Sequence, residues 1–246
     1  HMAYDHLFTR HHDDHLFVKV HDNSRFTDPF REAHSRAYLK KEYELYSHLK
    51  EVGFAFLPDR IALIDDTILG MDALHPEDGW TWRAPSQEPL IDAYIRDTLE
   101  AFHTLQATTP PLQPNYHESI NRTYETIWSE GWDAINQACL DRIVERIRSF
   151  SAQWTMEQQA VSEALINDLP HLWQNVLAFN RDQPLFMAHN DARQSNIAWH
   201  PEHGTRIVDW SWGDPAPKNA DATMFLTDLA KSGYDVLPYL ESYNTN

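Results

Sequence analysis

The segment 186–215 holds the residues whose types and spacing best support chemistry. Asp191 follows an apolar run, and Asn196 comes five residues after it. Asp209 follows Asn196 by thirteen residues and closes a second apolar run. A strand that ends in a carboxylate places that group at the edge of a sheet, where ligands and metal ions reach it. We therefore expect these side chains to form one site.

This set of side chains suits phosphoryl transfer. Asn196 and Asp209 offer amide and carboxylate oxygens, which Mg²⁺ accepts while phosphates and water complete its shell. Asp191 then remains free to orient a hydroxyl group and to accept its proton. Phosphoryl transfer needs positioning, charge neutralisation and a base. An isolated Asp-x-x-x-x-Asn pattern usually marks a loop with Asx turns, but the accompanying Asp209 favours the chemical interpretation.

Apolar periodicity predicts the elements that must position these side chains. Near the N-terminus we expect strands at 6–11 and 15–20, a helix at 30–52, and strands at 60–64 and 67–71. Turn-forming pairs of Asp residues separate the strands of both hairpins. This first part is predicted to be a small α+β unit.

The composition changes after residue 74, where a segment rich in proline and polar residues is typical of a linker. Beyond it we expect helices at 90–105, 119–127, 133–150, 155–169, 220–231 and 234–243, and strands at 184–188, 196–199 and 205–208. The predicted organisation is an N-lobe at 1–74, a hinge or linker at 75–89, and a helical C-lobe at 90–246 that carries the site.

Two short stretches resemble a known family. HNDARQSN (189–196) followed by IVDW (207–210) is similar to the motif of the aminoglycoside phosphotransferase and choline kinase-like family, H-G-D-x-x-x-x-N and then an apolar strand ending in Asp. Asn190 stands where that family usually has glycine. The resemblance covers nearly the whole chain. It implies an α+β, two-lobed, protein-kinase-like fold, with a small β-rich N-lobe and a larger, mainly helical C-lobe.

The first lobe carries further points of resemblance. Lys19, in Phe-Val-Lys-Val, is similar to the family lysine that pairs with nucleotide phosphates, although an isolated lysine in such a strand is commonly an edge residue. Glu42 matches the helix glutamate that pairs with this lysine, with Glu44 as the second choice. The stretch that contains Asp72 and Leu74 resembles the hinge whose backbone would receive the adenine.

The resemblance also implies roles in the second lobe. Asp191 is similar to the catalytic base, and Asn196 and Asp209 to the metal ligands. Arg193 would neutralise the transferring phosphoryl group, or would be a surface arginine with a structural role. His189 is expected to hold the catalytic loop in place. The implied cofactors are ATP or GTP together with Mg²⁺.

The sequence departs from the family before the lysine strand. Relatives have a strand, a glycine-bearing loop and a second strand there, whereas the first glycine of this chain is Gly53 and only about one strand, 7–11, precedes Lys19. Three explanations are open. The gene or cloned segment begins late, the protein binds nucleotide without that loop, or it is a decayed kinase that retains the pocket without turnover. The intact residues Asp191, Asn196 and Asp209 argue against decay of the catalytic centre.

Composition excludes several classes of partner. The 246 residues include 20 Lys and Arg against 37 Asp and Glu, a net charge of −17. Nucleic acids and anionic membranes attract basic surfaces, so neither is expected as a partner. The charge favours cationic ligands. The single cysteine, Cys139, excludes an internal disulfide framework and indicates a reducing, cytoplasmic location. No apolar run approaches the length of about 18 residues that spans a bilayer.

Two other groups of residues bear on ligand binding. Four acidic residues lie beyond the metal motif, where relatives often build the acceptor wall; they are Asp214, Asp221, Asp228 and Glu241. Any one of them is more commonly part of a solvated acidic surface, but as a set they suggest an amine-bearing acceptor. Histidines near the N-terminus suggest a metal site; they are His6, His11, His12, His15 and His21. Because alternate residues of a strand share a face, His11 and His12 point to opposite sides, and we do not expect convergence on one physiological ion.

These observations favour a small-molecule O-phosphotransferase that transfers the nucleotide γ-phosphate to an acceptor hydroxyl. The alternative is a catalytically impaired kinase-like protein that acts as a nucleotide or small-molecule binding module. A hydrolase that uses Asp191 and His189 ranks third, because the sequence lacks a nucleophile-elbow pattern. The acceptor, the preferred nucleotide and the oligomeric state are not specified by the sequence.

Overall fold

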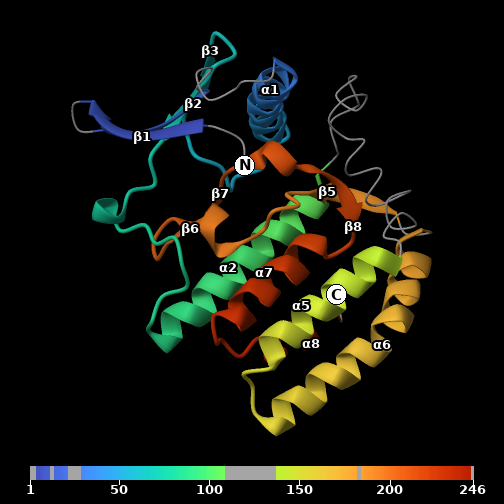
Figure 1. Ribbon diagram of the computed structural model, residues 1–246. Coiled ribbons are helices and arrows are strands. Elements are labelled where there is room, and N and C mark those ends of the chain that lie inside the picture. Colours follow the sequence, from blue (N-terminus) through green and yellow to red (C-terminus); the bar gives the residue numbers. More distant parts are fainter. Residues whose placement is uncertain (1–3, 12–13, 22–28, 109–136, 182–183, 245–246) are drawn as a thin grey trace. The chain divides into compact units, whose positions relative to one another are not determined.

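The computed structural model describes residues 4–11, 14–21, 29–108, 137–181 and 184–244 (Figure 1). The chain forms two compact units. Unit 1 comprises His1–Gln113 and Leu185–Asn246, and unit 2 comprises Pro114–Pro184. The predicted division into lobes at 1–74 and 90–246 stays a prediction.

A four-stranded antiparallel sheet opens unit 1, with strands in the order β1, β2, β4, β3 (Figure 1). Its strands are β1 (Tyr4–His11), β2 (Asp14–His21), β3 (Ile61–Ile64) and β4 (Ile68–Asp72). Both predicted hairpins are therefore confirmed. Lys19 lies opposite Leu69 of the neighbouring strand. Strand β2 is thus an inner strand, and its lysine is 4% exposed.

Helix α1 (Pro29–Glu51) packs against this sheet and confirms the predicted helix. Its buried face includes Leu39, Tyr46 and Leu49, which recur at the spacing of one helix face. The chain turns at Gly53, whose φ of 81° is readily adopted only without a side chain. The helix thereby presents Glu42 to the strand that carries Lys19.

The rest of unit 1 contains three helices and two small antiparallel sheets in the described residues. The helices are α2 (Glu88–Gln106), α7 (Ala220–Lys231) and α8 (Leu237–Asn244). The sheets pair β5 (Leu185–Ala188) with β8 (Asp214–Pro217), and β6 (Ile197–His200) with β7 (Gly204–Ile207). Short 3₁₀ turns lie at η2 (Pro76–Asp78), η5 (Gln194–Asn196) and η6 (Trp210–Trp212).

Aromatic side chains join helices α2 and α7 in the core of unit 1. Tyr94 and Phe102 of α2 meet Phe225 of α7 edge to face, with ring centroids 5.6 and 6.0 Å apart. All three are fully buried, and such edge contacts add to the stabilisation from apolar burial. His103, one residue from Phe102, resembles a family helix position that we expect in the core; it is exposed instead, because the adjacent helix face points to solvent.

Strand β8 is an element that periodicity does not predict. Its sequence, Asp-Pro-Ala-Pro, contains two prolines, which lack the N–H that a ladder requires. The strand nevertheless pairs with β5, with Ala188 opposite Asp214. Prolines are tolerated in edge strands, and the sheet has only these two strands.

Unit 2 contains two described helices that pack on each other, α5 (Gln137–Ser151) and α6 (Met156–Arg181). Arg148 of α5 donates two hydrogen bonds, at 3.0 and 3.1 Å, to the carboxylate of Glu163 in α6. Helix α6 continues past Pro170, where we predicted an end at residue 169, because one proline inside a long helix interrupts its ladder without ending it. The helix predicted at 119–127 lies outside the described residues. Among those described, no helix combines the length and the apolar character needed to cross a membrane.

Candidate active site

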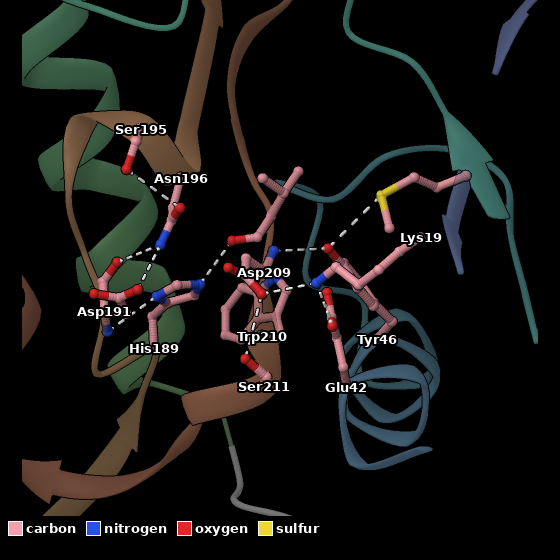
Figure 2. Close-up of polar contacts among 12 residues, drawn as sticks. Lys19, Glu42, Tyr46, His189, Asp191, Ser195, Asn196, Asp209, Trp210 and Ser211 are labelled. Carbon is pink, nitrogen blue, oxygen red and sulfur yellow. Dashed lines mark hydrogen bonds and ion pairs between the residues drawn. The ribbon is translucent and has the colours of Figure 1, made fainter. Parts of the chain in front are cut away.

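A buried ion-pair cluster joins the sheet, helix α1 and the segment after β7 (Figure 2). The Nζ of Lys19 lies 2.8 Å from Oε2 of Glu42 and 2.9 Å from Oδ1 of Asp209. Glu42 is 1% exposed, and the carboxylate of Asp209 is partly open. The structure therefore places Lys19 and its predicted partner Glu42 beside Asp209, the predicted metal ligand.

Burial and charge shift the ionisation of this cluster in different directions. Burial raises the pKa of Glu42 to about 7, although Lys19 acts against this shift. Burial also opposes the charge of Lys19, but the two carboxylates outweigh it and hold the pKa of Lys19 above its usual range. For Asp209, burial would raise the pKa, but the charge and hydrogen bond of Lys19, together with His189 and Ser211, outweigh it and lower the pKa. At neutral pH the cluster thus holds a firmly charged lysine and a firmly ionised Asp209.

Asp209 is held by its backbone as well as by its side chain. Its φ of 65° lies in the left-handed region, which is uncommon for a residue other than glycine. The hydroxyl of Tyr46 accepts its backbone N–H at 3.1 Å, and the hydroxyl of Ser211 lies 3.3 Å from Oδ1 (Figure 2). Tyr46 is fully buried in α1. These contacts fix the orientation of the Asp209 side chain.

His189 connects the loop that contains Asp191 to the segment before Asp209. Its Nδ1 accepts the backbone N–H of Asp191 at 3.2 Å, and its Nε2 lies 2.9 Å from the carbonyl oxygen of Val208. The two contacts agree on one tautomer, with Nδ1 as acceptor and Nε2–H as donor. The ring is fully buried against Trp210. The geometry agrees with the structural role expected of His189.

The carboxylate of Asp221 anchors the start of the same loop. It accepts the backbone N–H groups of His189 at 2.7 Å and of Asn190 at 2.8 Å. Asp221 is 2% exposed, and burial raises the pKa of its carboxyl. An acid in this position cannot form an acceptor wall, so our expectation for Asp221 is wrong. Its role follows from helix α7, which presents it to the loop from within the core.

Asn190 replaces the family glycine without distorting the loop. Its φ is 62°, a left-handed conformation that glycine adopts freely and asparagine tolerates. Its side-chain amide donates to the carbonyl oxygens of Asp214 at 2.9 Å and of Trp212 at 3.3 Å. The departure from the family pattern therefore retains the turn and adds two contacts.

Two donors converge on one oxygen of Asp191. Its Oδ2 accepts a hydrogen bond from Arg193 at 2.7 Å. It accepts another from Nδ2 of Asn196 at 2.9 Å (Figure 2). Nδ2 of Asn196 also donates to the backbone oxygen of Asp191 at 2.9 Å. Asp191 thus has a fixed orientation, and the Oδ1 atom is the carboxylate oxygen that these contacts leave to a ligand.

A cavity of about 320 Å³ adjoins these groups. Its polar lining includes Lys19, Glu42, Asn196 and Asp209, and its apolar lining includes Phe17, Met71, Leu74 and Trp82. Such a mixture of apolar walls and a few convergent polar groups is typical of a cofactor site. The structure therefore brings the predicted lysine, glutamate and metal ligands to one cavity.

The predicted hinge residues also reach this cavity. Asp72 and Leu74 are among its lining residues. The carboxylate of Asp72 is held by the backbone N–H and guanidinium of Arg60. The carbonyl oxygen of Leu74 accepts Nε1–H of Trp82 at 3.0 Å. Sequence reasoning did not single out this indole contact, because the two residues belong to a loop without periodicity.

A second cavity, of about 730 Å³, shares Trp82 and Ser195 with the first. Arg193, Asp228 and Tyr234 also line it. Asp228 accepts hydrogen bonds from the backbone N–H of Gln194 at 3.1 Å and from its side chain at 3.3 Å. Arg193, which donates a hydrogen bond to Asp191, therefore lines the second cavity.

The remaining acids of the expected acceptor wall are placed differently. The carboxylate of Asp214 lies 3.9 Å from Nζ of Lys41, and both side chains are largely buried. The side chain of Glu241 lies outside the described ones. Among the acids whose side chains the structure describes, Asp228 lines the second cavity.

The match to a family model decides the relationship of the chain. Residues 8–239 match the model of the phosphotransferase enzyme family. The chain belongs to the phosphotransferase enzyme family. A comparison with curated protein sequences returned no match.

Solved structures of related phosphotransferases have a similar fold. Aminoglycoside phosphotransferase APH(3'')-Id from Streptomyces rimosus, in complex with ADP and streptomycin, is 13% identical, with a TM-score of 0.53, and the match covers 99% of this chain and 84% of that one. An aminoglycoside-3'-phosphotransferase of type VIII is 18% identical, with a TM-score of 0.50 and coverage of 92% and 73%. The expected kinase-like α+β fold is thereby confirmed.

Choline kinase LicA from Streptococcus pneumoniae is also similar, at 14% identity and a TM-score of 0.48. The match covers 91% of this chain and 65% of the choline kinase, so the chain spans less than two thirds of that relative's length.

Proposed function

We propose that this chain is a nucleotide-dependent O-phosphotransferase acting on a small-molecule hydroxyl acceptor. The observation that carries the proposal is the contact of Lys19 with both Glu42 and Asp209 at a cavity that Asn196 also lines. Membership of the phosphotransferase enzyme family supports the same reaction type. An isolated lysine on a strand would not require a fully buried carboxylate partner, whereas a phosphate-binding lysine must be held in place and charged.

The nucleotide would occupy the cavity of about 320 Å³. Its base would lie between the apolar residues Leu74 and Trp82, and its phosphates would reach the ammonium of Lys19. The backbone N–H of Leu74 is the hinge donor proposed for adenine or guanine, since the carbonyl oxygen of Leu74 is already bonded to Trp82. ATP and GTP are both candidates, and ADP is bound by the related Streptomyces rimosus enzyme.

The donor atoms at one side of this cavity fit Mg²⁺. Because Nδ2 of Asn196 is committed to Asp191, a cation would bind its Oδ1, which lies 3.4 Å from the hydroxyl of Ser195. Asp209 adds an ionised carboxylate, and amide and carboxylate oxygens are ligands that Mg²⁺ accepts. When bound, the ion would neutralise charge on the phosphates. Lys19 shares that task from the protein side.

Asp191 would orient the acceptor hydroxyl and accept its proton. Its Oδ2 is held by Arg193 and Asn196, so Oδ1 is left to receive the hydroxyl hydrogen bond. The hydroxyl oxygen attacks the γ-phosphorus, the bond from phosphorus to the bridging oxygen breaks, and the nucleoside diphosphate leaves. The proton of the hydroxyl passes to Asp191. Arg193, beside Asp191, would offset the charge of the transferring group.

The acceptor would occupy the cavity of about 730 Å³, which meets the nucleotide cavity at Trp82 and Ser195. Its polar lining suits a hydroxylated compound. A net charge of −17 favours acceptors that carry amines, which form the first group to test.

An acceptor panel tests the proposal. Aminoglycosides, choline, ethanolamine and uncharged polyols are incubated with ATP or GTP and Mg²⁺, and nucleoside diphosphate release and phosphorylated product are both measured. We expect product with at least one acceptor and its loss in Asp191→Ala. Nucleotide binding without any product across the panel would favour the binding-module alternative, and unchanged product formation in Asp191→Ala would remove Asp191 as the base.

A further inference from the structure

Two histidines and a glutamate meet at the junction of strand β2 and turn η2. His15 lies at the start of β2, and His75 and Glu77 lie at η2, sixty or more residues later. One ligand atom from each lies within 4.8 Å of the others. Oε2 of Glu77 is 3.9 Å from Nε2 of His15 and 3.9 Å from Nδ1 of His75. Three groups with metal-binding chemistry thus face one point.

The orientation of His15 suits a metal ligand. Its Nδ1 lies 2.8 Å from Oδ2 of Asp78, which leaves Nε2, 3.9 Å from Oε2 of Glu77, as the nitrogen that would bind an ion. In metal sites, ligating histidines almost always donate their other ring N–H to a carboxylate or carbonyl. Asp78 supplies that second contact here, and it would fix both the tautomer and the ring of His15.

His75 also presents an unprotonated nitrogen. Its Nδ1 accepts the backbone N–H of Glu77 at 3.2 Å, so the lone pair lies on Nδ1. This nitrogen is the one that lies 3.9 Å from Oε2 of Glu77. The rings of His15 and His75 have centroids 4.6 Å apart. Metal binding at Nδ1 would exchange one backbone hydrogen bond for a coordinate bond.

The distances are close to those of a coordinated ion. Tetrahedral Zn²⁺ with bonds of about 2.1 Å separates its ligand atoms by roughly 3.4 Å. The two contacts of Glu77 at 3.9 Å would therefore have to shorten by about 0.5 Å. The nitrogens of His15 and His75, which lie within 4.8 Å of each other, would also have to approach. The side chain of Glu77 is 73% exposed and can make this movement. Two imidazoles with one carboxylate suit Zn²⁺ and neighbouring transition metals, whereas Mg²⁺ prefers oxygen ligands.

We propose that His15, His75 and Glu77 form a site for a divalent transition-metal ion of the zinc class. The site differs from the Mg²⁺ ligands proposed at Asn196 and Asp209 in its residues and in its donor chemistry. It joins β2 to the segment after β4, where the carbonyl oxygen of His15 already accepts the backbone N–H of Ala73 at 2.9 Å. A bound ion would cross-link the strand of Lys19 to the segment that follows the hinge.

The chain contains a matched control for this site. The sequence His-Pro-Glu occurs at 75–77 and again at 200–202. In the second copy the backbone N–H of Glu202 donates to Nδ1 of His200 at 3.0 Å, just as Glu77 donates to His75. No histidine from a distant element completes this second turn into a ligand cluster among the described residues. Glu77→Gln and Glu202→Gln therefore make the same chemical change in the same local turn.

The test is calorimetric titration of the full chain with Zn²⁺ in the presence of excess Mg²⁺, with thermal melting as a second readout. We expect one tight equivalent of Zn²⁺ and a rise in melting temperature for the unmodified chain. Glu77→Gln should weaken that equivalent at least tenfold, and His15→Ala should remove it, while Glu202→Gln leaves it unchanged.

Equal Zn²⁺ binding in the unmodified chain and in both Glu77→Gln and His15→Ala would overturn the proposal. So would an equal loss in Glu202→Gln, or the absence of any tight equivalent. Melting curves without metal show whether His15→Ala still folds. If His15→Ala does not fold, Glu77→Gln is the decisive variant, because Glu77 is exposed and its replacement leaves the fold intact.

Discussion

The carboxylate of Asp221 accepts the backbone N–H of His189 at 2.7 Å, although the two residues are 32 positions apart. The same carboxylate holds Asn190, so one buried side chain of helix α7 sets the start of the loop that ends in Asp191 and Asn196. Helix α7 thereby contacts the loop that contains Asp191 directly. The position of the proposed base therefore depends on a buried acid of helix α7.

Asp221→Asn should destabilise unit 1 and lower transfer activity. An asparagine offers one oxygen and one NH₂ group, so one of the two backbone N–H groups loses its acceptor and faces a donor. Leaving a buried donor unpaired costs about 1–3 kcal/mol. We expect a loss of this size in urea unfolding. Asp168→Asn, an exposed change on α6, should leave stability within about 0.5 kcal/mol. Equal effects of both variants would contradict the anchoring role.

Glu42 should make stability depend on pH in a defined direction. Burial raises its pKa from 4.5 to about 7, so the folded protein binds this proton more tightly than the unfolded chain. Its favourable contribution is therefore complete below pH 4.5 and is lost as the pH rises through 7. Relative to Glu42→Gln, the unmodified chain should lose about 3 kcal/mol of unfolding free energy over this range. Urea unfolding at several pH values measures it, and parallel pH profiles would argue against the shift.

Asp191→Ala should separate turnover from binding. Removal of a general base typically lowers turnover by about 10²–10⁴-fold. Nucleotide affinity should change little, because Asp191 does not line the nucleotide cavity. Steady-state kinetics with the acceptor found in the panel, beside nucleotide titration of the same variant, gives both quantities. A parallel fall of affinity and turnover would indicate that the variant disturbs the loop and not the chemistry alone.

Trp82→Phe should weaken nucleotide binding while retaining an aromatic wall. The substitution removes the Nε1–H that the buried Leu74 carbonyl oxygen accepts at 3.0 Å. Without this hydrogen bond the segment at Leu74 is less ordered in the free protein, and nucleotide binding has to order it again. If the hinge carries the base, a cost of about 1 kcal/mol corresponds to a roughly fivefold weaker affinity. Trp154→Phe changes a tryptophan of unit 2 and should have no effect. Unchanged affinity in Trp82→Phe would remove Leu74 from the nucleotide site.

Much of the site could be predicted from sequence because its residue types are spaced along short elements. Lys19 and Glu42 lie on a strand and a helix whose periodicity is clear, and Asp209 closes an apolar strand. The structure brings these groups together as the pattern indicates. The resemblance to a family supplied their roles, which periodicity alone does not reveal.

Other features depend on tertiary placement that no local pattern reports. Asp221 appeared to be one of several acids near the site, and only its burial under the catalytic loop reveals its role. Tyr46 follows the pattern of a core residue, yet its hydroxyl accepts the backbone N–H of Asp209. The prolines of β8 have low strand propensity, so the sequence does not predict this strand. It forms because it pairs with β5 in a two-stranded sheet. His15 lies on β2, whereas its neighbours His75 and Glu77 come from turn η2, which follows β4.

The most direct test of the central claim is titration of the chain with ATP and with GTP, with and without Mg²⁺, beside Asp209→Asn. If Lys19, Asn196 and Asp209 hold the phosphates and their metal ion, Mg²⁺ should strengthen binding of at least one nucleotide about tenfold or more. That enhancement should vanish in Asp209→Asn, because the variant lacks the ionised carboxylate. No binding of either nucleotide at millimolar concentration, or a Mg²⁺ enhancement that survives in Asp209→Asn, would contradict the account.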